Sequence, residues 1–258
     1  MSEVGSADGT RIGYEISGTG PAVILVDGAM CYRGSGPMRG IAAELSSGCT
    51  VVLYDRRGRG ESGDTPSYRV EREIDDIEAL LGVMGGRSAL VGISSGGALA
   101  TLAAARLRSA VSHLIVFEPP YLPEPARPAA AMYTAELTAA LAAGNRDRAV
   151  AAFLARVGAP AEAIEGMRRS PAWAGMTAIA TTLGYDDAVM ADSAVPAAAS
   201  GIVAPTLALA GGASPDFLQW GARELAAVVP DAEFRVLPAQ GHDVEAAPLA
   251  DAVRDAIS

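Results

Sequence analysis

Residues 88–100 change from a strand pattern to a helix pattern across a single bend. An apolar run typical of a buried strand ends at Gly92, and a run of small residues typical of a helix begins at Ser95. Ser94 is left on the bend, inside the pattern G-x-S-x-G. The two glycines make room where a strand turns sharply into a helix. We therefore expect the Ser94 hydroxyl to stand exposed at the carboxyl edge of a sheet.

The pattern alone could also be a plain glycine and serine loop, because the 258 residues include 29 glycines. The flanking elements favour the bend, since strand and helix patterns alternate along the chain, which predicts a parallel sheet with right-handed crossovers. A turn at Asp8-Gly9 makes the first strand an edge strand paired with the N-terminal segment. The expected strands are 11–16, 22–26, 50–54, 88–92, 113–117, 205–210 and 233–237, and the expected helices are 70–84, the run from Ser95, 217–229 and 247–257.

The chain changes character after residue 118. Residues 119–128 are rich in proline, and 129–200 are rich in alanine with helical periodicity and no convincing strand. We read 119–200 as an inserted helical cap on a core made of 1–118 and 201–258. Five large cap side chains could line a pocket, although packing inside the cap is the favoured reading: Met132, Phe153, Met167, Trp173 and Met176.

Composition narrows the classes of partner. The net charge of −10 argues against nucleic acid, because phosphate binding needs clustered cations. The chain has no apolar span of about 20 residues, so no membrane crossing is predicted. No signal peptide is visible, so we expect a cytoplasmic protein. Cys31 and Cys49 lack the spacing of metal ligands, and no metal or cofactor is predicted. The sequence does not indicate whether the protein is a monomer or an oligomer.

A serine nucleophile needs a base that titrates near neutrality, and the chain has two histidines. His113 opens a predicted buried strand, at the opposite end of the sheet from the Ser94 bend, and is expected to be structural. His242 lies in a loop beyond the last strand, directly after Gly241. We therefore expect His242 to be the base.

The order of strand, loop, bend serine, cap and late histidine resembles the α/β-hydrolase superfamily over nearly the whole chain. Two further matching pieces are residues 55–62 (DRRGRGES), after the strand that ends at Tyr54, and Gly241-His242 near the end. The resemblance implies the α/β-hydrolase fold, a mostly parallel sheet flanked by helices with an inserted helical cap. It also implies a nucleophile, an acid and a histidine in that chain order, and hydrolysis or acyl transfer as the chemistry.

The acid is where the chain departs from the family pattern. Most relatives have an aspartate a few residues after the strand at 205–210, a place that Ser214 holds here, and Asp216 lies two residues later. Other relatives take the acid from the end of the strand that follows the helix after the bend serine, where this chain has Glu118. We favour Glu118, with Asp216 as the alternative acid. Asp243 and the cap residue Asp186 remain as further candidates.

The resemblance also places a second departure in the loop after residue 26. Relatives usually have His-Gly there, and this chain has Asp27-Gly28. The oxyanion would be held by the backbone N–H groups of Ser95 and Ala29, so the side-chain change need not abolish the site. Asp27 could be turned away, hold an arginine such as Arg33, or bind a cationic group of the substrate.

Cys31 follows in the same loop and could face the pocket, although a small core residue is the favoured reading. The arginines of residues 55–63 could form a phosphate or acid pocket. Pairing within the turn, with Asp55 and Glu61, is favoured.

These features together predict a serine hydrolase acting on an ester, thioester or lactone of a small, largely apolar molecule, without a cofactor. A serine on the bend argues against epoxide hydrolase and haloalkane dehalogenase chemistry, which require a carboxylate there. The alternatives are a small-molecule binder that has lost catalysis, an acyltransferase or a carbon–carbon bond hydrolase. The missing aspartate at Ser214 is the best support for a binder.

Overall fold

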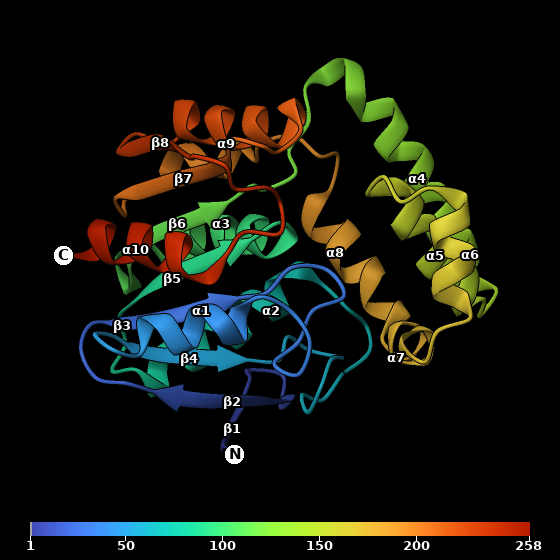
Figure 1. Ribbon diagram of the computed structural model, residues 1–258. Coiled ribbons are helices and arrows are strands. Elements are labelled where there is room, and N and C mark those ends of the chain that lie inside the picture. The colour runs from blue at the N-terminus through green and yellow to red at the C-terminus, as the bar shows by residue number, and fades with distance from the viewer. Residues whose placement is uncertain (1) are drawn as a thin grey trace.

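A computed structural model describes residues 2–258 and shows one eight-stranded sheet with the strand order β1-β2-β4-β3-β5-β6-β7-β8 (Figure 1). The two pairings at one edge, β1 with β2 and β2 with β4, are antiparallel, and all the others are parallel. The predicted pairing of strand 11–16 with the N-terminal segment is therefore confirmed. Its predicted edge position is wrong, because β2 also pairs with β4 and β1 forms the edge of the sheet. The strands are β1 Ser2–Gly5, β2 Arg11–Ser17, β3 Ala22–Val26, β4 Thr50–Tyr54, β5 Ser88–Ile93, β6 Val111–Phe117, β7 Thr206–Gly211 and β8 Ala232–Leu237.

Helices cover both faces of this sheet, which explains why the central strands are mainly apolar. Side chains of a strand alternate between the faces: Ile24 and Val26 of β3 pack on one side, and Val23 and Leu25 pack on the other. The first face is covered by α2 Val70–Val83, α3 Ser95–Leu107 and α9 Asp216–Val228, and the second by α1 Met38–Leu45 and α10 Ala246–Ile257. The sequence analysis missed α1, a helix of only eight residues.

The segment between β6 and β7 is helical, with no strand among its described residues. Its helices are α4 Arg127–Ala142, α5 Arg146–Arg156, α6 Ala161–Arg168, α7 Ala172–Ala178 and α8 Leu183–Met190. They share an apolar cluster that includes Leu137, Val150, Leu154 and Trp173. In Figure 1, α4–α7 lie beside the sheet and α8 lies between them and α3. The assignment of 119–200 as a separate domain stays a prediction.

The five large cap side chains have different surroundings. Trp173 is buried in the apolar cluster of the cap, as the favoured reading had it. Met132 is 75% exposed and Met167 is 40% exposed, so these two serve neither a pocket nor the cluster.

Among residues 2–258, no helix combines the length and the apolar character that a membrane crossing requires.

Candidate active site

Ser94 occupies the bend between β5 and α3 with φ 55° and ψ −129°. Residues other than glycine rarely adopt this backbone conformation, so the surrounding structure has to enforce it. The Ser94 N–H donates to the Phe117 carbonyl at 2.9 Å, and the Ser94 carbonyl accepts from the N–H groups of Gly97 and Ala98. The predicted bend is therefore present and held on both sides.

The glycines of the bend are required by close backbone contacts. A Cβ atom at Gly96 would lie 2.3 Å from the Val26 carbonyl oxygen and 2.4 Å from the Asp27 carbonyl oxygen. At Gly92 it would lie 2.5 Å from the Gly96 carbonyl oxygen. These distances are far below van der Waals contact, so the strand, the helix and the neighbouring loop approach one another only because both positions lack a side chain.

A carboxylate and an imidazole meet beside this bend. His242 Nδ1 lies 2.6 Å from Glu118 Oε2, and the Gly211 N–H donates to Glu118 Oε1 at 2.7 Å. Glu118 follows β6 directly and is fully buried, whereas the His242 side chain, in the loop after β8, is 41% exposed. Both carboxylate oxygens are therefore occupied, and one ring nitrogen of His242 is committed to Glu118.

The other acid candidates do not take this position. Asp216 is the exposed first residue of α9, and Asp243 is exposed in the loop. Asp186 is buried but binds two arginines and the Ser95 hydroxyl. His113, near the amino end of β6, lines a separate hollow with Asp231.

Ser94 and His242 both line a pocket of about 350 Å³ between the sheet and the helical segment. The core also contributes Ala29 and Ser95. Most of the wall is apolar, including Tyr133, Phe153, Val157, Met190, Pro215, Phe217 and Leu218, and the charged lining residues are Arg156, Asp186 and Asp187. Of the five large cap side chains considered from the sequence, only Phe153 lines this pocket.

The loop after β3 passes directly over the bend. A Cβ atom at Gly28 would lie 3.2 Å from Ser94 Cβ, so the loop backbone and the serine are in contact. The Gly28 carbonyl accepts from Arg59 Nη1 at 2.6 Å. Ala29, the next residue, lines the pocket, and so does Ser95 at the start of α3. The two predicted backbone donors therefore belong to segments that flank Ser94.

Comparison with known proteins identifies the family of this chain. The model of the alpha/beta hydrolase family matches residues 18–255. The chain belongs to the alpha/beta hydrolase family. This family member is 40% identical to an alpha/beta hydrolase from Sphaerobacter thermophilus, with a TM-score of 0.88 and coverage of 100% of both chains. A hydrolase from Pseudomonas aeruginosa shares the fold at 23% identity, with a TM-score of 0.74 over 99% of this chain and 96% of that one.

Curated relatives match only part of this α/β-hydrolase. The uncharacterized hydrolase YraK of Bacillus subtilis is 36% identical over 94 residues, which is 35% of this chain and 34% of YraK. The chain therefore aligns with about a third of that relative's length.

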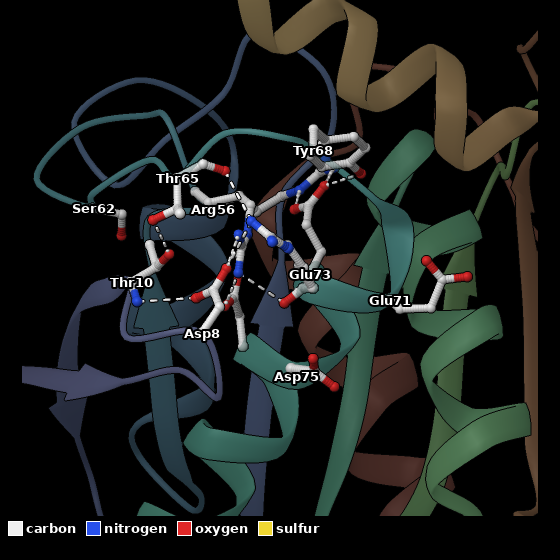
Figure 2. Close-up of polar contacts among 12 residues, drawn as sticks. Asp8, Thr10, Arg56, Ser62, Thr65, Tyr68, Glu71, Glu73 and Asp75 are labelled. Carbon is white, nitrogen blue, oxygen red and sulfur yellow. Dashed lines mark hydrogen bonds and ion pairs between the residues drawn. The ribbon is translucent and has the colours of Figure 1, made fainter.

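The arginines of the turn at residues 55–63 are engaged in ion pairs, but the partners differ from those predicted. Arg56 binds Glu73 through two hydrogen bonds of 2.7 Å (Figure 2), and Arg57 binds Asp76 through two of 2.7 and 2.8 Å. Arg59 binds Asp186. All three guanidinium groups lie beneath the protein surface, which leaves no open phosphate pocket.

The predicted partners Asp55 and Glu61 instead bind Arg33. The expected pairing within the turn was therefore wrong, because α2 and α8 bring carboxylates to buried guanidinium groups. Burial alone would raise the pKa of Glu73, but the adjacent Arg56 outweighs it and holds that pKa below its usual range.

Asp27 of this α/β-hydrolase is 2% exposed, and neither carboxylate oxygen has a hydrogen-bond partner among the described residues. Burial raises the pKa of Asp27 to about 7, although Arg59 and Arg56 oppose the shift. Arg33 binds Asp55, so the expectation that Asp27 holds Arg33 is wrong. Asp27 does not line the pocket either, which leaves the reading that its side chain is turned away. Cys31 is likewise absent from the pocket wall.

Sequence reasoning missed the buried arginines that contact the loop after β3. Asp186 was considered only as an acid for His242, whereas it binds Ser95 Oγ at 2.8 Å. The signal available was an acidic pair, Asp186-Asp187, in an otherwise apolar segment.

Among residues 2–258, no group of three or more His, Cys, Asp or Glu side chains is arranged to hold a metal ion.

Proposed function

We propose that this family member is a serine hydrolase in which Ser94 is the nucleophile, His242 the base and Glu118 the acid. The observation that carries the proposal is the 2.6 Å contact between His242 Nδ1 and Glu118 Oε2 on the same pocket that Ser94 lines. Ser94 follows β5, Glu118 follows β6 and His242 lies in the loop after β8, in the chain order of nucleophile, acid and histidine.

Glu118 fixes the tautomer of His242. The Gly211 N–H occupies Oε1, so Oε2 is the oxygen that accepts a proton-bearing Nδ1. With the proton on Nδ1, the Nε2 lone pair is free to take the proton of the Ser94 hydroxyl. The buried carboxylate also stabilises the imidazolium that forms in this step.

The reaction then has two halves. Ser94 Oγ attacks the carbonyl carbon as His242 takes its proton, and the tetrahedral intermediate expels the leaving group, which receives that proton. An acyl-enzyme remains. Water attacks the acyl-enzyme with His242 again as base, which releases the carboxylic acid and restores the Ser94 hydroxyl.

The negative oxygen of both intermediates requires donors that are already in place. We assign this role to the N–H groups of Ser95 and Ala29, which belong to the two segments flanking Ser94. Ser95 begins α3, so its N–H also carries the positive end of the helix dipole.

The pocket wall supports a small, largely apolar substrate with an ester, thioester or lactone group. A volume of about 350 Å³ and a wall of mainly apolar side chains suit an acyl chain or a small ring. The departure that favoured a binder was the missing aspartate at Ser214. Glu118 contacts His242 at 2.6 Å, and this contact supports a catalytic role over the binder.

A fluorophosphonate probe and a panel of p-nitrophenyl esters of increasing acyl length test the proposal. We expect the probe to label Ser94, as located by peptide mass spectrometry, and short to medium acyl esters to be hydrolysed. Ser94→Ala is the control and should lose both properties while retaining the fold. Folded wild-type protein that is not labelled and hydrolyses no ester would overturn the proposal.

A further inference from the structure

Asp186 of α8 uses one buried carboxylate to bind Ser95, next to the candidate nucleophile, and two arginines of the turn at residues 55–63. Its Oδ1 accepts from Ser95 Oγ at 2.8 Å and from Arg56 Nη1 at 2.7 Å, and its Oδ2 accepts from Arg59 Nη2 at 2.5 Å. The side chain is only 7% exposed. A residue of the helical segment is thus built into the core directly behind the nucleophile.

The two arginines continue from Asp186 to the loop after β3. Arg59 Nη1 donates to the carbonyl oxygens of Gly28 at 2.6 Å and Cys31 at 3.2 Å, and Arg56 Nη1 donates to that of Asp27 at 3.2 Å. Three carbonyl groups of this loop are therefore held on the side of the buried arginines.

The hydrogen bond from Arg59 to the Gly28 carbonyl determines the direction of the Ala29 N–H. In a trans peptide the C=O and the N–H of one unit point in opposite directions. Because the Gly28 carbonyl points at Arg59, the N–H of the same peptide unit points the other way, and Ala29 itself lines the pocket beside Ser94. A rotation of this one peptide would replace a donor with a carbonyl oxygen.

We propose that Asp186 is a positioning residue that acts through Arg59 to hold the Gly28–Ala29 peptide in its donor orientation, so that helix α8 completes the oxyanion hole. The inference rests on the proposed function, because it assigns a task to a group that the proposed reaction needs. It differs from the roles of Ser94, His242 and Glu118, since Asp186 acts on the donors and not on the proton transfer.

The charge of Asp186 is what the arrangement needs. Within residues 2–258, it is the one carboxylate that pairs with Arg59, whereas Arg56 also has Glu73. A buried guanidinium that loses its ion-pair partner is strongly destabilised and tends to move toward water or another partner. Such a movement of Arg59 would leave the Gly28 carbonyl with only the long bond from the Cys31 N–H, at 3.4 Å.

The test compares Asp186→Asn with Asp76→Asn. The amide oxygen of Asp186→Asn can still accept from Ser95 Oγ, so the substitution removes mainly the charge that Arg59 needs. Asp76 is equally buried and pairs with Arg57 of the same turn, but it contacts neither the loop after β3 nor the pocket. Both variants should lose stability in urea.

Activity should separate the two variants. With p-nitrophenyl butyrate, Asp186→Asn should lower kcat by about 10²-fold to 10³-fold, as loss of one oxyanion donor does, with little change in KM. The affinity for phenylboronic acid, which forms a tetrahedral adduct with an active serine, should fall along with kcat. Asp76→Asn should keep both kcat and the boronate affinity.

Arg59→Met is a second variant, which removes the donor to Gly28 while Asp186 keeps Arg56. Its kcat loss should match that of Asp186→Asn, and the double variant should lose no more than either single one. Unchanged kcat and boronate affinity in Asp186→Asn and Arg59→Met, or an equal loss in Asp76→Asn, would refute the inference. Wild-type protein without esterase activity or fluorophosphonate labelling would refute the proposed function, which is a separate result.

Discussion

His242 Nδ1 lies 2.6 Å from Glu118 Oε2, although the two residues are 124 positions apart in the chain. Glu118 is fully buried, has a φ of 49°, and gives its other oxygen to the Gly211 N–H. The carboxylate therefore has a single orientation, set by the ends of β6 and β7, and only one of its oxygens faces the imidazole.

This orientation predicts the effect of Glu118→Gln. The Gly211 N–H requires an acceptor, so the amide oxygen of the variant takes that side and the NH₂ group faces His242 Nδ1. The imidazole is then held with its proton on Nε2, the tautomer that cannot accept the proton of Ser94. We expect kcat to fall by about 10³-fold to 10⁴-fold with little change in KM, measured with p-nitrophenyl esters.

Asp216→Asn is the matched control, since Asp216 is exposed and lies outside the pocket wall. We expect this variant to keep wild-type kcat/KM. A large loss in Asp216→Asn together with a small loss in Glu118→Gln would show that Asp216 is the acid in solution.

The backbone of Ser94 predicts a difference between two inactive variants. At φ 55° and ψ −129° a Cβ atom is strained, and glycine is not. Ser94→Gly should therefore be more stable than Ser94→Ala by about 1 kcal/mol in urea unfolding. Neither variant should be labelled by a fluorophosphonate. Equal stability of the two would mean that the bend stores no strain.

The unpartnered carboxyl group of Asp27 predicts a pH dependence of stability. Its pKa is about 7 in the folded protein and ordinarily near 3.8, so between these values the folded state binds the extra proton and stability falls as pH rises. Asp27→Asn carries no charge at any of these pH values. Its stability relative to wild type should therefore increase from pH 5 to pH 8, by on the order of 2 kcal/mol. Urea unfolding at the two pH values checks this, and a difference that does not change with pH would contradict it.

Substitution by alanine should change the stability of the protein in opposite directions at two helical glycines. A Cβ at Gly96 would lie 2.3 Å from a backbone oxygen, so Gly96→Ala has to displace the loop after β3 and should cost about 3 kcal/mol or more. Gly166 in α6 has nothing within 4 Å of that position, so Gly166→Ala should gain about 0.5 to 1 kcal/mol. Thermal unfolding of both variants measures this contrast. Similar losses at both sites would mean that the close approach at Gly96 is not what requires glycine.

Much of the framework could be read from local patterns. Runs such as residues 22–26 and 51–54 are apolar throughout because both faces of the sheet are covered, and each proved to lie in a strand. The bend at Ser94 was visible because the change from strand pattern to helix pattern and the close approach of Gly92 to Gly96 involve neighbours in the chain. The contacts of Gly96 with Val26 and Asp27 appear only in the tertiary structure. The short helix α1 escaped notice because eight residues hold too little periodicity.

Local patterns could not assign partners to the charged groups. The turn at 55–63 holds arginines and acids side by side, so pairing within the turn was the natural expectation. Its arginines instead pair with Glu73, Asp76 and Asp186, the last of which is 130 residues away from Arg56. Burial explains the outcome, because a guanidinium removed from water needs a carboxylate partner and further hydrogen-bond acceptors.

The sequence by itself determined which segments are strands, where the serine bend lies and which histidine stands in a free loop. Each of these depends on residues within a few positions of one another. Only the tertiary structure decided that Glu118 and not Asp216 meets His242, and that Asp186 reaches the loop after β3 through Arg59. These contacts follow from the order of strands in the sheet and from the path of the helical segment over it, which bring together residues that no local pattern relates.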